Sequence, residues 1–165
     1  MPISRRAFLG GSMLGCAIAF LGTGWLFEED AADAAAFPFT LPDAEWKKRL
    51  TDGQYRVLRR HDTEAPFSSP LNKEHREGHF DCAGCTQPLF SSRTKFDSGT
   101  GWPSFWQPIA RGAIRTRSDR TLGMERTEVL CSRCGGHLGH VFDDGPRPTG
   151  LRYCMNGVAL RFVPT

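Results

Sequence analysis

The segments Cys82-Ala83-Gly84-Cys85 and Cys131-Ser132-Arg133-Cys134 are two Cys-x-x-Cys knuckles with 45 residues between them. Glycine stands within or just after each knuckle, at Gly84 and at Gly135-Gly136, as a tight turn requires. Four thiolates in this arrangement close a tetrahedral structural site around Zn²⁺ that leaves no open position for a substrate. We therefore predict that Cys82, Cys85, Cys131 and Cys134 hold one structural zinc ion.

Three other interpretations of the knuckles exist. The first two are a pair of local disulfides and a redox Cys-x-x-Cys, but a disulfide across so short a loop gains little loop entropy, and two redox motifs would be unusual in one small β domain. The third is a Cys2His2 site formed by the second knuckle with His137 and His140, which would leave the first knuckle without a role. The four-cysteine site accounts for all four thiols.

Cys154 is the next feature, in the run Gly150-Leu151-Arg152-Tyr153-Cys154-Met155-Asn156. If this run is a strand, alternation places Arg152, Cys154 and Asn156 on one face. A cation near the thiol favours the thiolate, and the amide can donate to a bound oxygen. The alternative is a buried structural cysteine. With four cysteines on zinc and Cys16 in a leader, Cys154 is the only thiol left, which favours a nucleophile.

Two histidines follow the second knuckle in His137-Leu138-Gly139-His140-Val141-Phe142-Asp143-Asp144. An imidazole can donate a proton to an oxygen near Cys154 at neutral pH, and we expect Asp144 to orient one of the two rings. The alternative is a pair of ordinary hydrogen-bonded surface histidines.

A glycine-rich loop, Ser98-Gly99-Thr100-Gly101-Trp102-Pro103-Ser104-Phe105-Trp106, carries three aromatic residues. It lacks the lysine and the strand–loop–helix context of a phosphate loop. We predict that it supplies an apolar wall for a substrate methyl group or thioether. The alternative is that these aromatic rings are simply core residues.

The pattern of short strands predicts a mainly β fold of antiparallel sheets, preceded by short N-terminal helices. Asp43–Leu50 is expected to be helical, with Trp46 and Leu50 on one face. A second helix, with buried Tyr55 and Leu58, should begin at the capping box Thr51-Asp52-Gly53-Gln54 and end near Arg60. We assign these helices to packing alone. Eight short strands are expected over His79–Cys82, Leu89–Ser91, Lys95–Asp97, Ala113–Arg117, Glu128–Cys131, His140–Phe142, Leu151–Met155 and Ala159–Val163.

The N-terminus has the features of an export signal. Ser4-Arg5-Arg6-Ala7-Phe8-Leu9 is a twin-arginine pattern, and an apolar run to Phe27 leads to the cleavage-like Ala34-Ala35-Ala36. We expect residues 1–36 to be a signal peptide and residues 37–165 the mature domain, in the periplasm or another extracytoplasmic compartment. Cleavage at Ala34, or retention of the apolar run as a membrane anchor, is the alternative. The formal net charge is only +3 and its basic residues are scattered, so nucleic-acid binding has no support.

Several segments are recognisable when taken together. They are the two knuckles, Thr63–Ser68, Lys95–Phe105, His137–Pro146 and Gly150–Asn156. On these motifs, the chain from about Trp46 to Pro164 resembles the methionine-R-sulfoxide reductase B family. The resemblance implies an oxidoreductase with two antiparallel sheets around a solvent-facing site and zinc on the far side. It also implies thiol-dependent reduction of methionine-R-sulfoxide, mainly in oxidised proteins, and hence a repair role under oxidative stress.

Carried over by position, the resemblance makes Cys154 the nucleophile and the four knuckle cysteines the zinc ligands. The polar side of the site would consist of His137, His140, Arg152 and Asn156, and Trp102 would form the apolar side. The expected intermediate is a sulfenic acid on Cys154.

The chain also departs from the family pattern. Thr100 stands where many members have a second, resolving cysteine, so an external thiol, thioredoxin-like or small, is the expected reductant. Asp62 and Ser69 replace the usual glycines, and Gly157 replaces the usual serine after Asn156, where we expect it to loosen the strand beside Cys154.

Two functions of other classes compete with the reductase. One is a zinc-held β module that binds a ligand in an aromatic cage without chemistry, and the other is a thiol peroxidase built on Cys154. Neither requires His137, His140, Arg152 and Asn156 together, and the reductase does.

Overall fold

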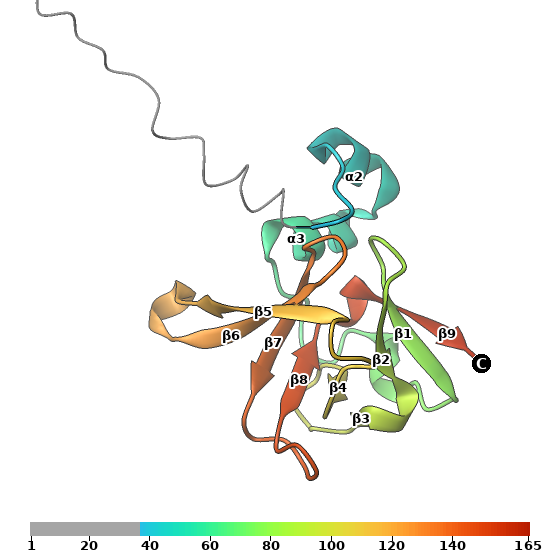
Figure 1. The fold of residues 1–165 in the computed structure, drawn as a ribbon, viewed down its shortest axis with the longest axis vertical. Coiled ribbons are helices and arrows are strands. Elements are labelled where there is room, and N and C mark those ends of the chain that lie inside the picture. The colour runs from blue at the N-terminus through green and yellow to red at the C-terminus, as the bar shows by residue number, and fades with distance from the viewer. Residues whose placement is uncertain (1–36) are drawn as a thin grey trace, which may run out of the picture.

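Two antiparallel sheets and a pair of short helices make up the computed structural model, which describes residues 37–165 (Figure 1). The twin-arginine signal and Cys16 lie outside the described residues. The smaller sheet has the strand order β2-β1-β9 and the larger one β3-β4-β8-β7-β6-β5. The strands are β1 (Gly78–Cys82), β2 (Pro88–Ser91), β3 (Lys95–Phe96), β4 (Ser104–Phe105), β5 (Ile114–Asp119), β6 (Arg126–Cys131), β7 (His137–Phe142), β8 (Arg152–Met155) and β9 (Leu160–Pro164). The predicted mainly β, two-sheet fold is confirmed.

The two helices follow the sequence prediction closely. Helix α2 spans Asp43–Arg49, with Trp46 buried, and α3 spans Asp52–Arg60, with both bonds of the predicted capping box formed. Leu58 is buried as expected, but Tyr55 is only partly buried because its hydroxyl donates to the exposed Asp43. Neither these helices nor any other within residues 37–165 is long and apolar enough to cross a membrane.

The core between the sheets is built on stacked aromatic rings. Phe105 of β4 lies 4.5 Å from Phe90 and 5.0 Å from Phe80 between ring centroids, and all three side chains are fully buried. The sequence analysis placed Phe105 in a loop and missed β4, because two residues show no alternation. For Phe105, therefore, the core interpretation of the glycine-rich segment is correct.

The four knuckle cysteines meet in one buried cluster. Cys82 and Cys131 end β1 and β6, which belong to different sheets. The Sγ atoms of Cys82 and Cys134 lie 3.7 Å apart, and those of Cys85 and Cys131 lie 3.5 Å apart. Each helix also contacts one of the knuckles: Arg49 of α2 donates to the Gly84 carbonyl, and Arg59 of α3 donates to the Cys134 carbonyl. The cluster thus joins both sheets and the helical layer.

Gly157 does not loosen the strand beside Cys154, contrary to the sequence-based expectation. Strand β8 ends at Met155, and Gly157 begins a buried 3-10 turn whose first amide donates to the Glu64 carboxylate at 2.5 Å. A Cβ at Gly157 would collide with the Ser69 side chain, coming within 2.5 Å of its Cβ. Ser69 and Gly157 are therefore in contact, and the absence of a side chain at Gly157 leaves the space that the Ser69 side chain fills.

This contact predicts a compensating pair of substitutions. Gly157→Ser alone should lower the free energy of unfolding by about 1–3 kcal/mol, because the site is already filled by Ser69. Ser69→Gly alone should cost only a few tenths of a kcal/mol through its hydroxyl bond to the Leu71 amide.

The double variant should recover most of the loss, and a denaturant-unfolding cycle over the four proteins measures this coupling. If the stability losses of the two single variants simply added in the double variant, the side chains at the two positions would not compete for the same space.

Candidate active site

Cys154 lies in β8 between two neighbouring strands. Its Cα is paired with His140 of β7 on one side and with Ser104 of β4 on the other. Tyr153 and Met155 are buried in the core, whereas the Cys154 side chain between them is partly exposed. The predicted alternation is seen only in part, because Arg152 is also buried and Asn156 lies beyond the end of the strand. Gly139 has to be a glycine here, because a Cβ at this residue would strike the carbonyl oxygen of Cys154.

A row of hydroxyl groups leads away from Cys154 on the β4 side. The Thr100 hydroxyl lies 3.9 Å from the Cys154 Sγ and 2.8 Å from the Ser98 hydroxyl. Ser98 in turn lies 2.7 Å from the hydroxyl of Ser104, the strand partner of Cys154. Thr100, at the position where the sequence resemblance leads us to expect a resolving cysteine in other proteins, is thus in contact with the thiol.

Burial raises the pKa of the Cys154 thiol above its ordinary value, and a hydrogen bond from Thr100 and the charge of Arg152 only partly oppose this. Arg152 lies across the ring of Phe142, 4.4 Å from its centroid. Its guanidinium makes two 2.8 Å bonds to the Asp144 carboxylate. Asp144 therefore orients Arg152, and the expectation that it orients a histidine is wrong.

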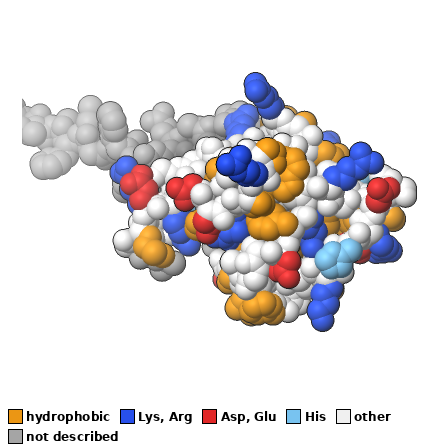
Figure 2. Space-filling model, turned by 90° about the horizontal axis from the view of Figure 1, so that it is seen from below, with side chains coloured by type: hydrophobic (Ala, Val, Ile, Leu, Met, Phe, Trp, Pro, Cys, Tyr) orange, Lys and Arg blue, Asp and Glu red, His pale blue; other side chains and the backbone are white. Residues whose placement is uncertain are grey.

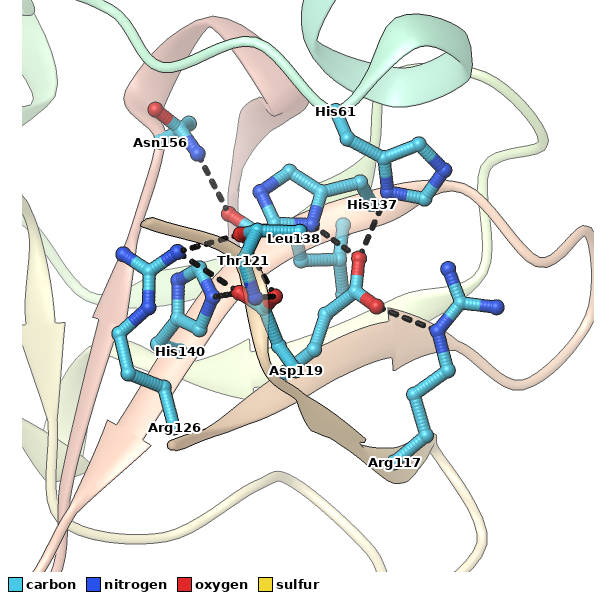
Figure 3. Close-up of polar contacts among 10 residues, drawn as sticks. His61, Arg117, Asp119, Thr121, Arg126, His137, Leu138, His140 and Asn156 are labelled. Carbon is cyan, nitrogen blue, oxygen red and sulfur yellow. Dashed lines mark hydrogen bonds and ion pairs between the residues drawn. The ribbon is translucent and has the colours of Figure 1, made fainter. Parts of the chain in front are cut away.

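His137 is fixed by Glu128 of β6. The two are joined by a 2.5 Å bond from His137 Nδ1, and both side chains are buried (Figure 3). Burial alone would raise the pKa of Glu128, but bonds from His137, His61 and Arg117 together hold it well below its ordinary value. The His137 Nε2 atom is buried and has no hydrogen-bond partner within the described chain. Buried polar atoms are usually paired, so this nitrogen is a candidate partner for a bound ligand.

His140 is fixed in the same way by Asp119 of β5, at 2.8 Å from its Nε2 (Figure 3). Amide and hydroxyl bonds from Thr121, together with His140, lower the pKa of Asp119, so it is a carboxylate at neutral pH. Burial lowers the pKa of His140 and favours the neutral ring. The two imidazole rings lie 5.5 Å apart between centroids, so the structure brings both predicted histidines together.

The sequence analysis missed both carboxylates and the part played by α3. Glu128 and Asp119, with His61 and Arg117, line a cavity of about 520 Å³ beside the histidines. His61 caps α3 and bonds to Glu128 at 2.8 Å, so this helix does more than pack. One signal was present: Glu128 is a charged residue directly before the apolar Val129-Leu130, in a strand expected to be buried.

Asn156 and Trp102 both form hydrogen bonds with the backbone of Glu64. The Asn156 amide oxygen accepts from the Glu64 amide at 3.0 Å, and its Nδ2 donates to the Leu138 carbonyl at 3.2 Å. An amide group has two hydrogens on nitrogen, so one remains for a ligand. The indole of Trp102 donates to the Glu64 carbonyl at 3.1 Å, which fixes the ring at the edge of the site.

Comparison with known proteins gives a consistent result. Residues 50–164 match the SelR domain. The chain is 58% identical to the peptide methionine sulfoxide reductase MsrB of Leptospira interrogans over 120 residues. This matched region makes up 73% of this chain and 92% of that protein. Two proteins of the same name are also similar. The one from Methanosarcina barkeri is 57% identical, over 73% of this chain and 84% of that protein, and the one from Agrobacterium fabrum is 54% identical, over 74% and 90%. The chain therefore belongs to the SelR domain family of peptide methionine sulfoxide reductases, MsrB.

Proposed function

We propose that this chain reduces methionine-R-sulfoxide to methionine, mainly in oxidised proteins, with Cys154 as the nucleophile. The observation that carries this proposal is the placement of Cys154. Among residues 37–165 it is the one cysteine outside the four-cysteine cluster, and it lies partly exposed opposite His140 in a chain of the MsrB family.

The reaction follows from the groups around that sulfur. The Cys154 sulfur attacks the sulfoxide sulfur, and the sulfoxide oxygen is transferred to it, leaving methionine and a Cys154 sulfenic acid. His137, through its unpartnered Nε2, or His140, through the ring nitrogen that does not bond Asp119, donates to the oxygen as charge develops there when its ring is in the imidazolium form. The remaining Asn156 hydrogen serves the same oxygen.

Arg152, held by Asp144, counteracts the cost of burying a thiolate at Cys154. Trp102 contacts the methyl group of the substrate. Each carboxylate acts on a neighbour rather than on the substrate: Asp119 and Glu128 fix the orientation of the two imidazole rings.

The sulfenic acid is returned to the thiol by an external reductant. Thr100 occupies the position beside Cys154 from which a second cysteine would attack, and the other four described cysteines are gathered in the buried cluster. Two thiols, from a thioredoxin-like protein or a small-molecule reductant, therefore reduce the sulfenic acid. Cys154 returns to the thiol, the oxygen leaves as water, and the two reductant thiols become a disulfide.

The four-cysteine cluster fits Zn²⁺. In a tetrahedron with Zn–S bonds of about 2.3 Å, neighbouring sulfurs lie about 3.8 Å apart. The 3.5 and 3.7 Å separations are close to that value and far from the S–S bond of about 2.05 Å in a disulfide. Cys82, Cys85, Cys131 and Cys134 would hold the ion, whose function is structural because all four positions are filled by protein.

The twin-arginine pattern supports export of the folded, metal-loaded protein and repair of oxidised proteins in the periplasm or outside the cell. In this proposal residues 1–36 are removed after export, and residues 37–165 form the working enzyme.

The first test separates the reductase from its rivals. Cys154→Ser should abolish reduction of the R epimer of a methionine sulfoxide peptide, and the wild-type protein should leave the S epimer intact. Chiral chromatography of the products measures both. Ser132→Ala, in the second knuckle but not a zinc ligand, serves as the control and should retain activity. A binding module would turn over neither epimer, and a peroxidase would prefer hydroperoxides.

The second test concerns the missing resolving cysteine. After one turnover without reductant, the intact mass of the wild-type protein should rise by one oxygen, about 16 Da, or by the mass of a sulfenic-acid trapping reagent. Thr100→Cys places a thiol next to Cys154, so its mass should instead fall by two hydrogens as a disulfide forms. A disulfide in the wild-type protein would contradict the external-thiol proposal.

A further inference from the structure

Phe67 is exposed in an unusual backbone conformation. Its exposed fraction is 72%, above the 42% of Ile109 and the 57% of Met124, the other exposed large hydrophobic residues of the described chain. Its φ of 64° lies in the left-handed region, which bulky side chains rarely adopt. An aromatic ring that is both solvent-exposed and on a strained backbone gains nothing for the fold, and such strain occurs most often at functional sites.

Two neighbouring segments hold Phe67 in place. Its amide donates to the Gly101 carbonyl at 2.7 Å, and Asn72 donates to the same carbonyl at 2.9 Å. A Cβ added at Gly101 would lie 3.0 Å from the Phe67 ring and 2.9 Å from its amide nitrogen, so ring and loop are in direct contact. The ring therefore rests on the glycine-rich loop instead of entering the core.

That loop is the one beside the nucleophile. Gly101 follows Thr100, whose hydroxyl contacts Cys154, and precedes Trp102. Trp102 is in turn bonded to Glu64, three residues before Phe67. Phe67 and Trp102 also line one small cavity of about 200 Å³, whose apolar wall includes Phe96 and Pro103.

Basic groups stand around this apolar wall. Lys73, His75 and Lys95 line the same cavity, and burial lowers the pKa of Lys95. Asp97 lines the cavity as well, so its rim carries charges of both signs. The molecular face in Figure 2 likewise carries separate apolar patches with basic and acidic side chains and one histidine around them. A partner on the cavity would contribute an apolar side chain.

We propose that Phe67, together with Trp102, docks an apolar side chain next to the methionine sulfoxide in an extended polypeptide substrate. This rests on the proposed reductase function and narrows its substrate class. The enzyme would favour sulfoxides flanked by large apolar residues over glycine-flanked or free ones. Buried methionines have such neighbours, so unfolded or damaged proteins would expose suitable sites.

The experiment compares three R-sulfoxide substrates: N-acetyl-methionine sulfoxide amide, a glycine-flanked peptide and a leucine-flanked peptide. The wild-type protein should prefer the leucine-flanked peptide by about tenfold in kcat/KM, mostly through KM. Phe67→Ala should remove that preference and leave the small substrate within about twofold. Ile109→Ala is the control, because it removes another exposed apolar side chain, from a residue whose backbone amide donates to Leu89 in the smaller sheet. It should leave kcat/KM unchanged for all three substrates.

Phe67→Asn provides a second variant, because asparagine tolerates the left-handed conformation. It should match Phe67→Ala in substrate preference without a fall in melting temperature. Equal losses on all three substrates, or no flank preference in the wild-type protein, would overturn the docking proposal. Failure of the wild-type protein on every sulfoxide would overturn the reductase function itself, and the docking proposal with it.

Discussion

The four-cysteine cluster is the constraint on which the rest of the structure depends. It joins the end of β1 in one sheet to the end of β6 in the other, and arginines of α2 and α3 bind its two knuckles. Among the described strands, none of one sheet pairs with a strand of the other. The Zn²⁺ proposed for the four thiols would therefore fix the relative position of the two sheets. Strand β7 begins directly after the second knuckle, and the histidines are placed from there.

The site itself is assembled by strand register. Pairing of β8 with β7 and β4 places Cys154 between His140 and Ser104, and Gly139 permits the close approach of the two backbones. The hairpin of β5 and β6 then brings a carboxylate to each imidazole ring. Cys154, the proposed nucleophile, therefore lies among groups that are each held by a second residue, which is how an active site keeps its geometry before substrate arrives.

Local patterns were sufficient to predict the helices, the capping box and most strands. Long-range pairing was not accessible in this way. The two-residue strand β4 has no periodicity of its own, and the partners of the histidines, Asp119 and Glu128, come from a hairpin whose register depends on the whole sheet. Asp144 was assigned to a histidine because it is close in sequence, but it lies beside Arg152 in space. The contact of Ser69 with Gly157 likewise spans the fold.

The central claim is that a metal-held frame positions Cys154. Elemental analysis of the purified protein, followed by thermal unfolding before and after treatment with a strong chelator, tests it most directly. We predict one zinc ion per chain, loss of the cooperative unfolding transition and of sulfoxide reduction on chelation, and recovery of both when Zn²⁺ is restored. A metal-free protein with unchanged melting temperature and full activity would contradict the account.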